Sequence, residues 1–262
     1  MTHTLHRRGS KSDLAHDYVV LAMAARGVNR DGAAPKLARA LEIFAAHNPV
    51  NFGNVAGNSF TRTLPEMVSL TRDNTVSHAV FRDIEDVTAV LQDLKKEDLG
   101  ISIVVSGLFD QVKASCRCAG LTPHTANVSL GIFGKTEKLP KEGVLEIASM
   151  CGHNMVSFGV IKKLVRDIED GFTTPEQAAK KIAASCLCGV FKLGACRSGL
   201  FPSYRRSKGM KTSEAKRLEF RRNLETGTFM IAPGIYDALS AKIAEVSGLN
   251  CLAMGGYAIS AT

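Results

Sequence analysis

The sequence predicts an α/β protein in which a small, mostly parallel sheet with flanking helices is followed by a second, shorter unit. Hydrophobic residues alternate between helical and extended spacing over residues 13–192. The segment Ile101–Ser106 is a continuous apolar run bounded by Gly100 and Gly107. Such a run is typical of a strand that is covered on both faces, as the strands of parallel sheets are. After it, residues 196–212 show no consistent period, which predicts a linker before the second unit.

Seven segments have the spacing of amphipathic helices, with apolar residues three or four positions apart. The last of them begins with Thr174 as the N-cap residue and Pro175 at the first helical position. The predicted helices span Asp13–Ala25, Ala34–Ala46, Pro65–Leu70, Asp83–Lys95, Asp110–Ala119, Val156–Asp170 and Thr174–Ser185.

Extended segments are predicted between these helices. They span Val50–Asn54, Ser77–Phe81, Ile101–Ser106 and Thr125–Leu130. The stretch Gly53–Asn58, GNVAGN, matches neither the Walker pattern nor the dinucleotide fingerprint, and we interpret it as a turn.

The composition is that of an ordinary globular protein, with 45% hydrophobic and 22% charged residues. The sequence lacks a run of about 18 apolar residues, so we expect no membrane-spanning segment and no membrane partner. The N-terminal residues also lack the apolar stretch of a secretory signal. We therefore expect a cytoplasmic protein whose seven cysteines are reduced.

The net charge of +8 is concentrated in one segment. Nine Lys or Arg residues and two Glu residues lie between Arg197 and Arg222, whereas the rest of the chain is almost neutral. No nucleic-acid recognition motif or zinc-finger spacing accompanies this charge, which argues against a nucleic-acid partner. We interpret residues 196–212 as a basic linker between an α/β domain over 1–195 and a C-terminal unit over 213–262.

The C-terminal unit has its own pattern of elements. The sequence predicts a charged helix over Ser213–Glu225, a strand over Phe229–Ala232, a helix over Tyr236–Val246 and a strand over Asn250–Met254. The first strand runs into the motif APGIYDALSA at Ala232–Ala241, and the second into Gly255-Gly256-Tyr257.

On these motifs, residues 218–262 resemble the start of the isocitrate lyase/phosphoenolpyruvate mutase superfamily. The resemblance implies the truncated start of a (β/α)8 barrel. It also implies a lyase or mutase that acts on a C–C or P–C bond of a small 2-oxo or 2-hydroxy acid. In that family, the element that matches Gly255, Gly256 and Tyr257 contacts the substrate beside a magnesium ion.

The resemblance covers only the first strands of such a barrel. The family's magnesium ligands lie on later strands, so they are absent from this chain and we expect it not to catalyse the reaction alone. A longer chain or a partner would have to complete the barrel. An exposed barrel edge would also favour a homo-oligomer, because unpaired strands are templates for pairing.

Cysteine and histidine residues cluster in two short stretches of the first domain. Cys151 and His153 form one stretch, and Cys186 and Cys188 form the other. Three thiols and an imidazole can ligate zinc or anchor an iron–sulfur cluster, which predicts a metal-binding module in residues 1–195.

Two other interpretations of these residues remain open. The cysteines can be ordinary buried residues, with Cys116, Cys118 and Cys196 as further thiols. Alternatively, Cys151 is a redox-active or nucleophilic thiol whose pKa is lowered by a helix beginning near Val156, with His153 as its base.

Overall fold

A computed structural model describes residues 4–153, 155–192 and 213–227, together with residues 232, 234–235, 243–244, 247, 249 and 253–254. The chain divides into two compact units, Met1–Arg205 and Arg206–Thr262. The division falls inside the basic segment 196–212. Within the described residues, the structure contains no helix with the length and apolar character needed to cross a membrane.

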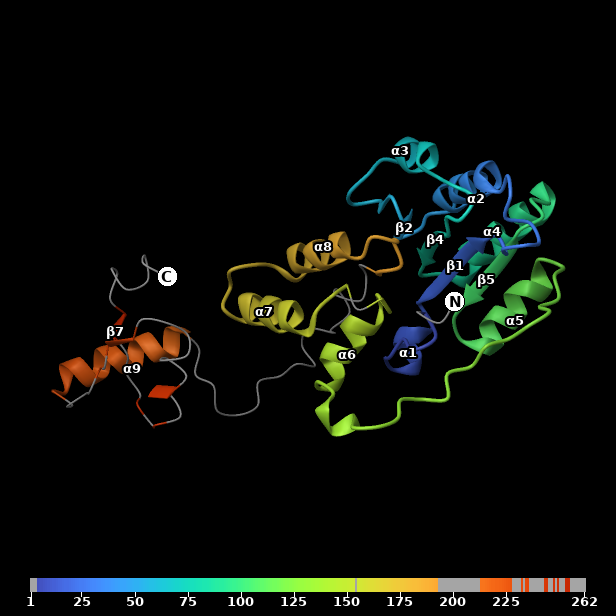
Figure 1. Cartoon of the computed structure of the whole chain (residues 1–262). Coiled ribbons are helices and arrows are strands. Elements are labelled where there is room, and N and C mark those ends of the chain that lie inside the picture. Colours follow the sequence, from blue (N-terminus) through green and yellow to red (C-terminus); the bar gives the residue numbers. More distant parts are fainter. Residues whose placement is uncertain are drawn as a thin grey trace. The chain divides into compact units, whose positions relative to one another are not determined.

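A five-stranded sheet with the order β3-β2-β4-β1-β5 forms the centre of the first unit (Figure 1). Every strand pair in this sheet is antiparallel, so the predicted mixture of helices and strands is confirmed but the mostly parallel sheet is wrong. The strands are β1 (Tyr18–Met23), β2 (Asn51–Asn54), β3 (Gly57–Asn58), β4 (Ser77–Phe81) and β5 (Ser102–Ser106).

The strand order explains why the alternation of helices and strands was misleading. β1 and β2 are joined through a helix and run in the same direction, but β4 lies between them in the opposite direction. β4 and β5 are likewise separated by β1. This is the split β-α-β arrangement of ferredoxin-like sheets, in which a helical crossover joins parallel strands that are not neighbours.

Nine helices and one 3-10 turn are described along the chain. They are α1 (Lys11–Leu14), α2 (Ala34–Ala46), α3 (Leu64–Ser69), α4 (Ile84–Glu97), α5 (Phe109–Cys118), η1 (Thr136–Lys138), α6 (Glu142–Ser149), α7 (Phe158–Glu169), α8 (Pro175–Ser185) and α9 (Ser213–Glu225). The Thr174 side chain accepts a hydrogen bond from the Gln177 N–H, which confirms Thr174 as the N-cap of α8.

Two predicted elements are wrong, and a third is a strand as predicted but is less buried than expected. The helix expected over Asp13–Ala25 is replaced by α1 and β1, because a strand buried on both faces has no polar side to reveal its period of two. β5 is an edge strand that is only half-buried, although its apolar run favoured full coverage. Residues 125–130 form no strand and are exposed.

The central strands send alternate side chains to two separate cores. Val19 and Leu21 of β1 pack with α6, α7 and α8, whereas Tyr18 and Val20 pack with α2 and α4. Figure 1 shows α7 and α8 side by side, away from α2 and α4. We call these two sides of the sheet the α6–α8 face and the α2/α4 face.

In the second unit, the described residues contain α9 and two short strands, β6 (Gly234–Ile235) and β7 (Ala253–Met254). β6 and β7 pair in parallel, with Gly234 opposite Ala253. The described part of this unit shows no barrel. The candidate substrate contacts Gly255, Gly256 and Tyr257 lie outside the described residues.

Candidate metal centre

The four predicted metal ligands come together at one place in the fold. Cys151 and His153 lie in the turn after α6, whereas Cys186 is the C-cap residue of α8 and Cys188 lies in the next turn. The Sγ atoms of Cys186 and Cys188 are 4.0 Å apart, and Cys188 Sγ is 3.6 Å from His153 Nδ1. Cys186 also hydrogen-bonds to Cys151. Folding therefore brings together two turns that are far apart in the sequence.

The two distances match the edges of a tetrahedral zinc site. With Zn–S bonds of about 2.3 Å and Zn–N bonds of about 2.05 Å, tetrahedral angles place two sulfurs about 3.8 Å apart and sulfur and nitrogen about 3.6 Å apart. Among the described residues, no group of three or more His, Cys, Asp or Glu side chains is arranged so that it could hold a metal ion as it stands. The match is pairwise, and binding a metal ion requires rotation of these side chains.

Burial differs among the four side chains. Cys151 and Cys186 are fully buried and Cys188 is 7% exposed, whereas His153 lies at the surface. The imidazole thus stands on the solvent side of the three sulfurs. A metal ion would reach the thiols from this side.

Hydrogen bonds control the charge of the sulfur atoms. The bond from Cys186 lowers the pKa of Cys151 to about 5, with help from the backbone N–H groups of His153 and Met155. The bond from Cys186 also lowers the pKa of Cys188 to about 6, with help from the Val190 N–H. The pKa of Cys186 is raised because its thiol proton is shared with the other two sulfurs. The hydrogen bond from Cys186, together with these backbone N–H groups, thus favours the thiolate forms of Cys151 and Cys188.

Two helix C-termini meet at this cluster. α6 ends at Ser149, just before Cys151, and α8 ends at Ser185, just before Cys186. The C-terminal end of a helix carries partial negative charge and favours a cation. The expected helix N-terminus near Cys151 is not there, because α7 begins at Phe158. Hydrogen bonds, and not a helix dipole, lower the pKa of Cys151.

The β2–β3 hairpin fastens the second cysteine turn to the sheet. Asn58 Nδ2 donates hydrogen bonds to the carbonyls of Ala183 (3.1 Å) and Cys186 (2.8 Å). Asn51 Nδ2 donates to the carbonyl of Phe191, at 3.0 Å. Residues 53–58, predicted as a turn, instead belong mostly to β2 and β3, with only Val55 and Ala56 between the strands, and the role of the hairpin's asparagines was missed. The available signal for this role was the presence of asparagines in the strands, because this residue type is depleted there.

Gly189 allows the same turn to lie directly on β2. Its φ of +76° is in the left-handed region, and a Cβ atom at this position would lie 2.4 Å from the carbonyl carbon of Phe52. Only glycine fits such an approach without displacing the backbone.

The other cysteines of the chain lie apart from this cluster or beyond the described residues. Cys116 packs in the core of the α2/α4 face, on the opposite side of the sheet. Cys118 is exposed at the end of α5. Cys196 and Cys251 lie outside the described residues.

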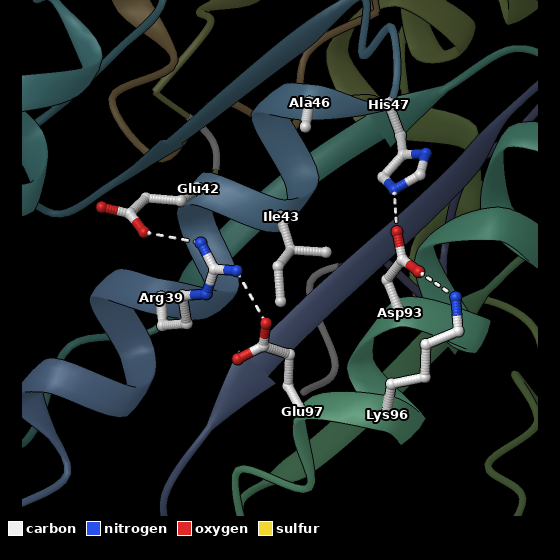
Figure 2. Close-up of a pocket in the computed structure, with 8 residues that line it drawn as sticks. All are labelled: Arg39, Glu42, Ile43, Ala46, His47, Asp93, Lys96 and Glu97. Atoms are coloured by element: carbon white, nitrogen blue, oxygen red, sulfur yellow. Dashed lines mark hydrogen bonds and ion pairs between the residues drawn. The ribbon is translucent and has the colours of Figure 1, made fainter.

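A groove lies between α2 and α4, but its polar groups are already paired (Figure 2). Arg39 forms ion pairs with Glu42 (3.1 Å) and Glu97 (2.7 Å). Asp93 pairs with both His47 and Lys96, each at 2.9 Å. All six charged residues that line the groove have partners within it, so nothing there points to a ligand.

Comparison of the chain with protein-family models, with curated proteins and with solved structures finds no match. The functional argument therefore rests on the geometry of the cysteine cluster.

Proposed function

We propose that the first unit is a metal-binding module that holds one zinc ion through Cys151, His153, Cys186 and Cys188. One observation carries this proposal: two turns with more than 30 intervening residues meet with their sulfur and nitrogen donors at ligand spacing. Backbone N–H groups directed at Cys151 and Cys188 support it, because they stabilise the thiolates that a metal requires.

The spacing favours a single ion over an iron–sulfur cluster. Donor atoms 3.6 and 4.0 Å apart can share one coordination sphere. The four cysteines of a [4Fe–4S] cluster bind four different iron atoms, so their sulfur atoms lie further apart. Three thiolates and one imidazole form a closed, four-coordinate set, which is typical of structural zinc sites. On this proposal, zinc joins the ends of α6 and α8 to each other.

The proposal is tested by elemental analysis and visible spectroscopy of the full chain after anaerobic purification. We expect about one equivalent of zinc per chain and no visible colour. Cys186→Ser and Cys188→Ser should each lose the metal. Cys118→Ser, which changes an exposed thiol on α5, is the matched control and should retain it.

Three results would contradict this proposal. A brown protein with visible absorbance would indicate an iron–sulfur cluster. A wild-type chain without metal, but with a reversible disulfide between two of the clustered cysteines, would favour the redox interpretation. Zinc that persists in both serine variants would place the metal elsewhere.

We propose a second, separate function for the C-terminal unit, as the opening of a lyase- or mutase-like barrel. The parallel pairing of β6 with β7 supports it, because the first two strands of a (β/α)8 barrel are parallel neighbours. The test is magnesium-dependent turnover of small 2-oxo acids by a longer chain or a complex in which the barrel is completed. Turnover that survives Gly256→Val would remove the Gly255–Tyr257 element from the substrate site.

A further inference from the structure

The N-terminal segment preceding α1 reaches both turns of the cysteine cluster through one side chain. Arg7 is almost completely buried, with 6% of its side chain exposed. Its Nη2 donates hydrogen bonds to the Met150 carbonyl, at 3.0 Å, and to the Val190 carbonyl. Met150 directly precedes Cys151, and Val190 follows Cys188 by two residues. A single guanidinium therefore bridges the two turns that carry all four candidate ligands.

The other nitrogens of Arg7 show how firmly this side chain is held. Nη1 forms an ion pair with Asp17, whose side chain is only 5% exposed. The remaining nitrogen, Nε, is buried and has no hydrogen-bond partner among the described residues. The neighbouring Arg8 differs, because it forms a partly exposed ion pair with Glu142. Burial of the Arg7 charge is costly and indicates a positional role.

We infer that Arg7 is a positioning residue of the metal centre: it fixes the separation between the Cys151–His153 turn and the Cys186–Cys188 turn. This inference rests on the proposed zinc-binding function. Arg7 acts through the Met150 and Val190 carbonyls and does not ligate the metal. Outer residues that orient ligands in this way are worth 10- to 100-fold in metal affinity.

The test compares Arg7→Gln and Arg7→Lys with the control Arg8→Gln in the full chain. Arg7→Lys keeps the charge beside Asp17 but lacks the planar fork that spans two carbonyls, so it guards against simple misfolding. Zinc dissociation constants come from competition with a chelator. Cobalt(II) substituted for zinc reports the ligand geometry through its visible bands.

We expect both Arg7 variants to bind zinc about 10- to 100-fold more weakly and to show altered cobalt bands, whereas Arg8→Gln matches wild type. A wild-type chain that holds zinc, with Arg7 variants of unchanged affinity and unchanged cobalt bands, would overturn the inference and leave the proposed function intact. An equal loss of thermal stability in the metal-free and zinc-loaded forms, without loss of affinity, would also overturn it. A wild-type chain without zinc would overturn both.

Discussion

The two faces of the five-stranded sheet both bury an apolar core, but they differ in the polar contacts that cross them. On the α2/α4 face, apolar side chains such as Phe44, Leu37 and Val20 are fully buried against one another. On the α6–α8 face, polar side chains cross from the sheet and the N-terminal segment to backbone carbonyls of the cysteine turns. Asn58 and Arg7 are the main examples.

This difference bears directly on function. Hydrophobic burial is non-directional, so it holds a helix on a sheet without fixing the position of any one atom. Hydrogen bonds are directional and fix particular carbonyls. A centre that needs its ligands at defined distances therefore depends on the second kind of contact. The comparison predicts that mutations on the α2/α4 face affect stability alone, whereas mutations around the cysteine turns also affect the metal.

The largest loss of stability is expected on the α2/α4 face. Phe44→Ala removes a fully buried aromatic side chain from α2 and should lower the free energy of unfolding by about 3–5 kcal/mol. Chemical denaturation measures this loss. The molecules that remain folded should bind zinc with unchanged affinity. Weaker zinc binding by these folded molecules would contradict the division between the faces.

A glycine pair provides the next test, with both stability and metal as readouts. Gly189→Ala must move the cysteine turn away from Phe52, because the new Cβ atom would overlap the backbone there. A non-glycine residue in the left-handed conformation also lowers the stability by about 1–2 kcal/mol. Overpacking should add about 1–3 kcal/mol. We expect weaker zinc binding in chelator competition and a lower melting temperature.

Gly171→Ala is the matched control for this variant. Gly171 has nearly the same φ, +75°, but a Cβ atom there would meet nothing within 4 Å. The Gly171→Ala variant should therefore lose only the stability that a left-handed non-glycine residue costs, and it should keep its zinc affinity. Equal zinc affinity in the two alanine variants would show that the contact with Phe52 does not position the ligands.

Local patterns in the sequence were sufficient for much of the α2/α4 face. The range Ala34–Ala46 predicted from apolar spacing is the observed α2, and Ser77–Phe81 is the observed β4. In both elements, the spacing of the apolar residues in the sequence indicates which side chains are buried. β1 was missed for the opposite reason, since its buried neighbours on both faces come from distant parts of the chain.

The four candidate ligands are recognisable in the sequence, whereas the contacts that support them are not. Cys151, His153, Cys186 and Cys188 form a recognisable set of residue types, and the structure brings them together. Nothing in the local sequence pairs Arg7 with Val190, because that contact depends on the completed fold. The strand directions were likewise undetermined, because a helical crossover does not reveal whether another strand lies between the two it joins.

The smallest of these effects on stability, and the most selective for the metal, is expected from two asparagines of one hairpin. Asn58→Ala leaves the carbonyls of Ala183 and Cys186 without their side-chain donor. Asn54→Ala removes the Nδ2 donor from Thr71 Oγ1 and from the Met67 carbonyl, in and just after α3, although the Met67 carbonyl still accepts from Thr71 Oγ1. Because both asparagines are buried, each variant should lose about 1–3 kcal/mol of stability.

The two variants should differ in how fast they release zinc. Asn58 holds the carbonyl of a candidate ligand residue, so its loss frees the Cys186–Cys188 turn, whereas Asn54 holds a helix with no candidate ligand. Stopped-flow transfer of zinc to a chromogenic chelator should therefore be accelerated only in Asn58→Ala. Equal acceleration would mean that general loosening of the hairpin governs release. Faster release from Asn58→Ala alone would show that a single directional contact on the α6–α8 face maintains the geometry of the ligands.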